Sequence, residues 1–279
     1  MLVAIDDNNQ RRYADQSEKK DKNGEKIRYY CPECHSRLTL KKGKKNIHHF
    51  AHAEDTDCRL SMKNGESLIH MLMKRTIKEI VEENNNCIIS ELEWGIGNRI
   101  ADYYFEVNDH QGNRRKIAVE CVHRHTNIDE FRSKNSYYYR NGIYTIWIFN
   151  LTRFLKKDNT FKDEITTNEI LKEAHTLNYG KVYAIDIPHK KVYAIHFDRI
   201  EREVEAVDLI DWEAWDGHSD PTIHEYTVGG YTRYLKNKRE PNPRIIPRFI
   251  VNSFSRNPSD SFLWYPRAVA SCYMKPYWK

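Results

Sequence analysis

The sequence predicts a mixed α/β (α+β) protein whose central stretch, residues 63–150, has its elements in the order α-β-β-β-α-β. Three observations support this prediction. Apolar residues recur at helical spacing after Glu66, two β-rich runs flank the polar loop around Gly112, and Ile143–Phe149 is a continuous apolar run. The last pattern is typical of a strand buried on both faces of a sheet. We expect a cysteine- and histidine-rich β module before this stretch, over residues 1–62, and a mixed region after it, over residues 151–279.

The N-terminal stretch carries the spacing of a metal-binding module. A short strand is expected at Leu2–Ile5, and further strands at Arg37–Lys42 and Asn46–Phe50 follow a CxxC turn. The candidate ligands are Cys31, Cys34, His49, His52 and Cys58. A CxxC turn places two thiolates together, and a His and a Cys from the following hairpin complete a tetrahedron, which is the preferred geometry of structural zinc. Of the two histidines, His52 is the preferred ligand, because His49 also fits a packed strand position.

Four lysines crowd the tip of the same hairpin: Lys41, Lys42, Lys44 and Lys45. Such a cluster indicates either a solvated turn or a contact with nucleic-acid phosphates. The sequence leaves both interpretations open.

A helix is predicted to begin near Glu66, where its apolar residues form one broad face. Glu66, His70 and Lys74 follow one another at intervals of four residues and therefore share one stripe of the helix. The stripe is either an exposed ladder of side-chain pairs or a polar face directed at the central hairpin.

The central hairpin carries two carboxylates in apolar surroundings. Its strands, Arg99–Val107 and Lys116–His123, fold about Gln111–Gly112, so that Asp102 falls opposite Glu120 and Cys121. Two neighbouring buried carboxylates are costly unless a cation lies between them. Hard oxygen ligands favour Mg²⁺ or Mn²⁺, the ions of phosphoryl chemistry.

The remaining elements follow from local signals. We expect a strand at Cys87–Trp94, a helix over Ile128–Arg140 capped by Asn127 and stopped by Asn141-Gly142, and a helix near Thr167–Leu177. Strands Lys181–Ile187 and Lys191–Phe197 form a hairpin around Pro188–Lys190. The chain after that hairpin, including its proline-rich segment 241–247, yields no element.

Composition restricts the class of protein and its location. Charged residues make up 30% of the chain, the mean hydropathy is −0.82, and no apolar run approaches a membrane span, so a cytoplasmic protein is expected. Six cysteines, three of them in one His-rich stretch, favour a metal site over disulfides. Residues 200–229 carry a net charge of −8 and residues 230–279 a net charge of +8. These blocks either neutralise each other or leave the aromatic, basic end available to nucleic acid.

Several motifs resemble those of the CoiA-like family of competence proteins. They are Tyr29-Tyr-Cys-Pro-Glu-Cys34, Lys41-Lys-Gly43, His49-Phe-Ala-His52 with Cys58, Glu66-Ser-x-x-His70, Arg99-x-x-Asp102, Ile117-Ala-Val-Glu120 and Tyr139-x-x-x-Ile143 through Trp147. The resemblance covers residues 1–150 well and the GKVYAI hairpin and Gly229-Gly230-Tyr231 more loosely. It implies a restriction-endonuclease-like domain of the PD-(D/E)xK class and a link to DNA and recombination.

The resemblance also implies residue roles. Asp102 would be the motif aspartate, Glu120 the glutamate of the ExK motif, and Glu66 an acid carried by the helix. The chain departs from the motif at Val122, where the class has lysine. An apolar side chain cannot orient water, so we expect His70, His123, His125 or Lys134 to substitute, with His125 and Lys134 in the easier positions.

The sequence therefore predicts a metal-dependent DNA nuclease with structural zinc and catalytic Mg²⁺ or Mn²⁺. Two alternatives stay open: a degenerate nuclease domain that binds DNA and recruits recombination proteins, and an RNA-cutting defence nuclease. Recombination or defence proteins and a second copy of the chain are possible partners. No membrane partner is expected.

Overall fold

The computed structural model describes residues 1–43, 47–53, 58, 66–109, 111–123, 127–178, 180–204, 207–212, 223–228 and 231–246. Over 201–204, 207–212, 223–228 and 231–237 only the backbone is described. Within these residues three sheets form, with strand orders β2-β1-β3-β4-β5, β10-β15-β12-β11-β9-β8-β7-β6 and β13-β14. The mixed α/β class predicted from the sequence is confirmed.

The first sheet is entirely antiparallel and carries the cysteine- and histidine-rich segment. Its strands are β1 (Val3–Asp6), β2 (Arg11–Tyr13), β3 (Tyr29–Tyr30), β4 (Arg37–Lys41) and β5 (His49–His52). The predicted strand Asn46–Phe50 is wrong in its bounds, since pairing with β4 begins at His49 and continues to His52. This shift carries His52 into the strand itself.

The large sheet contains the predicted central stretch. Its elements in chain order are α1 (Leu68–Asn84), β6 (Cys87–Ile96), β7 (Arg99–Asn108), β8 (Arg114–Val122), α2 (Ile128–Arg140) and β9 (Ile143–Asn150). The α-β-β-β-α-β order is therefore confirmed. Ser67 caps α1 by accepting the His70 N–H, and Asn127 caps α2 as predicted by accepting the Asp129 N–H.

The same sheet continues beyond β9. The further elements are the 3₁₀ helix η1 (Leu151–Phe154), β10 (Ile165–Thr166), α3 (Glu169–Leu177), β11 (Val182–Asp186), β12 (Lys191–Val204) and β15 (Tyr231–Ile246). Strands β8, β9 and β11 run parallel, so their carboxyl ends lie at one end of the sheet. The predicted hairpin corresponds to β11 and β12, and the proline-rich segment that sequence could not place belongs partly to β15.

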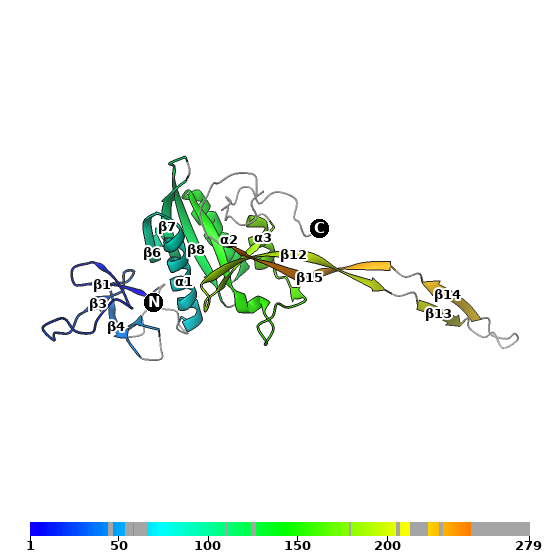
Figure 1. Cartoon of the computed structure of the whole chain (residues 1–279), viewed down its shortest axis with the longest axis horizontal. Coiled ribbons are helices and arrows are strands. Elements are labelled where there is room, and N and C mark those ends of the chain that lie inside the picture. The colour runs from blue at the N-terminus through cyan, green and yellow to red at the C-terminus, as the bar shows by residue number, and fades with distance from the viewer. Residues whose placement is uncertain are drawn as a thin grey trace.

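Helices cover both faces of the large sheet (Figure 1). Met73, Ile77 and Val81 of α1 share one apolar cluster with residues such as Phe105 and Val119 of the sheet. On the opposite face, Phe131 of α2 and Leu171 of α3 pack with the sheet in a second cluster. The Phe131 and Trp147 rings lie 4.3 Å apart, centroid to centroid, which fixes α2 over β9.

Strand β1 is shared between the two sheets' cores. Leu2 and Val3 pack in the cluster beneath α1, whereas Ala4 packs with Cys31 and Phe50 inside the first sheet's own core. The two sheets are therefore joined by buried apolar contacts through β1 rather than by chain connectivity alone.

Strands β12 and β15 extend beyond the body of the protein as a long twisted ribbon (Figure 1). They pair antiparallel from Val192↔Ile246 to Val204↔Tyr231, with an irregularity between Arg199 and Glu201. Strands β13 (Val207–Trp212) and β14 (Ile223–Val228) form a separate two-stranded sheet at the distal end. No helix among the described residues has the length and apolar character needed to span a membrane.

Candidate active site

The candidate metal ligands of the first sheet converge on one point. Single ligand atoms of Cys31, Cys34, His52 and Cys58 all lie within 4.8 Å of one another. The Cys31 and Cys58 sulfurs are 3.7 Å apart, and the Cys34 sulfur lies 3.3 Å from His52 Nε2. Tetrahedral zinc with Zn–S bonds of about 2.3 Å requires a sulfur–sulfur separation of roughly 3.8 Å. The four residues can therefore hold a tetrahedral metal ion such as zinc.

His49 does not belong to this group. Its Nδ1 lies 2.9 Å from the Ile47 carbonyl oxygen, and only His52 of the two histidines approaches the thiols. His52, the preferred ligand of the two, lies with the three cysteines, whereas His49, also included among the predicted ligands, is not brought into this group.

The hairpin-tip lysines are only partly described. Lys41 is exposed at the end of β4, and Lys42 pairs with Glu18 at 2.7 Å. Lys44 and Lys45 lie outside the described residues. The structure thus shows a solvated Lys41 and a paired Lys42, and their contact with phosphates stays a prediction.

The two central carboxylates meet where β7 and β8 separate. The backbone pairing of this hairpin ends at Tyr103↔Val119, one residue before Asp102 and Glu120. Beyond that point the Asp102 carboxylate, rather than a backbone carbonyl group of β7, accepts the Cys121 N–H at 2.8 Å. Asp102 thus lies beside Glu120 and Cys121 as predicted, although Asn108 pairs with Arg114, so the register is shifted by one residue from the predicted turn at Gln111–Gly112.

Glu66 and His70 face this site from the start of α1. His70 Nδ1 lies 2.7 Å from Glu66 Oε1, and its Nε2 lies 3.0 Å from Asp102 Oδ2. Burial lowers the pKa of His70, but the two carboxylates outweigh it and raise that pKa to about 10. The imidazole is therefore a cation that bridges two acids and orients Asp102.

Lys74, one helical turn further, is buried rather than exposed. Its Nζ lies 2.5 Å from Glu66 Oε1 and 2.6 Å from Glu93 Oε1, and only 3% of the residue is accessible to solvent. The exposed-ladder interpretation of this stripe is thus wrong for Lys74. Burial raises the pKa of Glu66, but Lys74 and His70 outweigh it and hold that pKa at about 2.

Glu93 is a site-adjacent acid that sequence analysis missed. Buried in β6 with a positive φ of 50°, it accepts the Leu2 and Val3 N–H groups at 2.9 and 3.2 Å. Glu93 is thus hydrogen-bonded to the N-terminal backbone, and a chain of ion pairs runs from it through Lys74, Glu66 and His70 to Asp102. Strand β6 contains two acids, Glu91 and Glu93, and the sequence offered no signal that Glu93 is the buried one.

Glu120 is held from the opposite face of the sheet. Lys134 Nζ lies 2.8 Å from Glu120 Oε2, and the Tyr138 hydroxyl donates to Oε1 at 2.6 Å. Both partners come from α2, four residues apart on one helical face. Tyr138 was missed, although its spacing from Lys134 indicated a shared face.

The pKa values of the two acids are driven apart. Burial raises the pKa of Glu120 to about 7, and the neighbouring Asp102 adds to the rise, although Lys134 opposes it. Burial also raises the pKa of Asp102, but His70, Lys74 and Lys134 outweigh it and hold that pKa well below its usual range. Paired acids with separated pKa values are common at catalytic centres.

The other candidates for the missing motif lysine are placed as follows. Val122 is buried in the cluster that contains Phe131 and Phe149, so its side chain contributes packing only. His123 is half-buried at the end of β8. His125 lies outside the described residues. Lys134 is the described cation that reaches Glu120.

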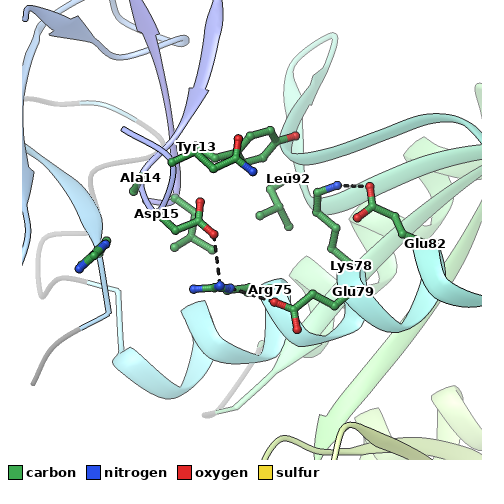
Figure 2. Close-up of a pocket in the computed structure, with 11 residues that line it drawn as sticks. Tyr13, Ala14, Asp15, Arg75, Lys78, Glu79, Glu82 and Leu92 are labelled. Carbon is green, nitrogen blue, oxygen red and sulfur yellow. Dashed lines mark hydrogen bonds and ion pairs between the residues drawn. The ribbon is translucent and has the colours of Figure 1, made fainter. Parts of the chain in front are cut away.

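A cavity of about 310 Å³ lies on the outer side of α1, between that helix and the segment Tyr13–Gln16. Figure 2 shows Arg75 between Asp15 and Glu79, with nitrogen–oxygen distances of 3.3 and 3.0 Å, and Lys78 paired with Glu82. Since these charges pair with one another, the cavity is a polar seam between the first sheet and α1. It lies apart from the acids at Asp102 and Glu120.

Comparison with known proteins agrees with this arrangement of two parts. The profile described as competence protein CoiA, N-terminal domain, matches residues 12–61, and the profile described as competence protein CoiA, nuclease-like domain, matches residues 66–199. The chain belongs to the CoiA-like family. The second match begins at Glu66 and includes the strands and helices that carry both acids.

A curated CoiA-like relative supports the assignment at lower coverage. The chain is 25% identical over 134 residues to competence protein CoiA of Bacillus subtilis (strain 168). That match covers 48% of this chain and 34% of the relative, so the chain spans about a third of the relative's length. No solved structure matches the chain.

Proposed function

We propose that this CoiA-like protein is a metal-dependent nuclease that hydrolyses phosphodiester bonds in DNA. The observation that carries the proposal is the 2.8 Å contact between Lys134 Nζ and Glu120 Oε2. It gives the Glu120 carboxylate a cation from α2 where the strand itself offers only Val122. The nuclease-like family match to residues 66–199 supports the same class of activity.

The residues at the site fit a divalent cation. Asp102 Oδ2 is occupied by His70 and Cys121 N–H, and among the described residues no hydrogen bond is recorded to its other oxygen. Burial, together with the neighbouring Asp102, raises the pKa of Glu120 despite Lys134, so a bound cation would favour the ionised carboxylate. Asp102 and Glu120 would hold Mg²⁺ or Mn²⁺, with Glu66 available to a second ion or a metal-bound water. When bound, such an ion polarises the scissile phosphate and lowers the pKa of water.

Side chains of the protein would supply the other roles in the reaction. Lys134 stands where it can orient water and offset charge that develops on the phosphorus oxygens. His70 fixes the Asp102 carboxylate, and Tyr138 fixes Glu120. In the reaction, water adds to phosphorus and one phosphorus–oxygen bond to the sugar breaks, leaving a phosphomonoester and a hydroxyl group.

A DNA-binding scaffold without cleavage activity is the second candidate. It is favoured by Val122, which is 3% exposed and packs into an apolar cluster instead of supplying the motif lysine. On this alternative the metal site and the zinc module would hold DNA for recombination proteins. An RNA-cutting nuclease would use the same residues as the first candidate and differ in substrate.

The test is cleavage of labelled single-stranded DNA, duplex DNA and RNA by the purified protein with Mg²⁺, with Mn²⁺ and without either. We expect metal-dependent cleavage of DNA that is lost in Asp102→Ala and Glu120→Ala proteins that still bind DNA. Absence of cleavage by folded protein that shifts DNA would replace the nuclease by the scaffold. Preferential cleavage of RNA would change the assigned substrate.

A further inference from the structure

A second pocket, of about 350 Å³, lies between η1, β10 and β15. Its lining is mostly polar and includes three cationic side chains, Arg153, Lys162 and Lys238, with a single carboxylate, Glu164. The apolar residues Ile165 and Leu171 form part of its wall. With three cations and one acid, the lining carries a net charge of +2.

The charges in this pocket are unevenly compensated. Lys238 pairs with Glu164 at 2.7 Å, whereas Lys162 Nζ donates to the Arg153 carbonyl oxygen at 2.8 Å. Arg153 lies 5.7 Å from the centroid of the Phe149 ring, and burial lowers its pKa. No recorded ion pair joins a carboxylate among the described residues to Arg153 or Lys162. Two cations thus remain available to an anion.

The pocket lies at the same end of the sheet as Glu120. Strands β8 and β9 are parallel, with Val122 beside Phe149, and η1 follows directly from the carboxyl end of β9. The pocket also shares the face of the sheet that α2 and α3 cover, because Leu171 and Ile165 pack in the same cluster as Val122. A polymer that crosses the sheet end at Glu120 can therefore continue towards Arg153.

We propose that the Arg153–Lys162–Lys238 pocket binds a backbone phosphate of the nucleic-acid strand whose scissile phosphate lies at Glu120. The proposal rests on the proposed function and adds a second contact to it. Guanidinium and ammonium groups bind phosphate through charge-assisted hydrogen bonds. Such a contact fixes the path of the strand without selecting its sequence. Glu164 opposes the anion and limits the affinity of the pocket.

The primary test measures binding of a fluorescein-labelled single-stranded 20-mer without added Mg²⁺ or Mn²⁺. We expect the Arg153→Gln/Lys162→Gln protein to bind about tenfold more weakly, and its slope of log Kd against log salt concentration to fall by about 0.7. The matched control is Lys156→Gln/Lys157→Gln, which removes two exposed lysines from the adjacent loop. The control should change the affinity less than twofold.

Two further variants separate binding from folding. Arg153→Lys keeps the charge and should bind within about threefold of the wild type. Glu164→Gln removes the opposing carboxylate and should bind about threefold more tightly, with a steeper salt dependence. A gain of affinity cannot result from misfolding. Unchanged affinity and salt slope in both the double glutamine variant and Glu164→Gln would overturn the inference.

Two further comparisons vary the length of the oligonucleotide and the source of the phosphate group. The difference between wild type and the double variant should be absent for a dinucleotide and should appear as the oligonucleotide lengthens. Binding of inorganic phosphate with no effect of the variants on the 20-mer would overturn the proposal. If the wild type cleaves DNA but substitution of Arg153 and Lys162 does not change binding, the phosphate pocket is rejected and the nuclease proposal stands. Variant-dependent binding without cleavage rejects the nuclease but supports the pocket.

Discussion

Lys134 Nζ lies 2.8 Å from Glu120 Oε2, although the two residues belong to different elements and approach from helix and sheet. The residue two positions after Glu120 on its own strand is Val122, which is buried in an apolar cluster. The helix thus supplies a cation that the strand lacks. The proposed chemistry requires a cation beside Glu120, and that cation can come from helix α2 as well as from the strand that carries Glu120.

Lys134→Met should reduce metal-dependent cleavage by about 10²–10³-fold, because a positioned cation near the reacting phosphate is lost. Arg140→Met removes an exposed cation from the same helix and should leave the rate within about twofold. The cleavage rates of both variants are measured as initial rates at saturating DNA, and thermal melting checks that each variant is folded. Equal rates for wild type and Lys134→Met would remove Lys134 from the site.

Lys74→Met should lower the free energy of unfolding by about 3–5 kcal/mol, since it leaves Glu93 as a buried carboxylate without its cation and removes one of the cations that pair with Glu66. Lys190→Met breaks an exposed pair with Glu79 and should cost at most about 1 kcal/mol. Urea unfolding of both proteins makes the comparison. A small effect for Lys74→Met would mean that the Glu66–Lys74–Glu93 network contributes no net stability.

The zinc prediction concerns metal content. The purified protein should contain one zinc ion per chain, and Cys34→Ser or His52→Ala should lose it, whereas His49→Ala should retain it. Elemental analysis after dialysis gives the answer. Zinc lost from His49→Ala and kept in His52→Ala would reverse the ligand assignment made from the structure.

Stability at acid pH should depend on His175. Burial lowers the pKa of this histidine to about 4, and His196 and Arg239 add to the shift. Between pH 4 and 6.5 the unfolded chain therefore binds a proton that the folded protein does not. Stability from this residue is complete above about pH 6.5 and falls by up to about 3 kcal/mol as the pH drops towards 4.

His175→Phe keeps a ring where the imidazole stacks on Phe197, at 5.4 Å between centroids, and cannot be protonated. Its free energy of unfolding should therefore decline less than that of the wild type between pH 6.5 and 4. Denaturant titrations at several pH values test the difference. Parallel curves for the two proteins would show that His175 does not control this loss.

Local sequence patterns predicted much of the fold and part of the candidate site. Helix α2 begins and ends where Asn127 and Asn141-Gly142 predict, because capping is decided by neighbouring residues. Hairpin arithmetic placed Asp102 near Glu120, although its register was wrong by one residue because the ladder is centred on Gln111 rather than between Gln111 and Gly112. Strand β5 was misplaced because its bounds depend on pairing with β4, which local propensity does not encode.

Sequence patterns could not predict contacts between residues that are far apart in the chain. Glu93 lies 19 residues from Lys74 and 91 from Leu2, and all three meet only after the two sheets pack. The ribbon of β12 and β15 was equally out of reach, because its second strand contains prolines that disfavour a strand assignment. Val122 signalled a departure from the motif and Lys134 was among its expected substitutes, but the contact of Lys134 with Glu120 depends on how α2 packs on the sheet.

The sharing of β1 between two cores has an evolutionary consequence. Because Ala4 packs inside the first sheet while Leu2 and Val3 pack beneath α1, this strand cannot be exchanged between relatives with one half alone. A chimera that joins the cysteine- and histidine-rich sheet of one homologue to the nuclease-like half of another must also match the Glu93 carboxylate to the backbone of Leu2 and Val3. A substitution on one side of this seam therefore needs a compatible residue on the other side if the buried contacts are to be kept.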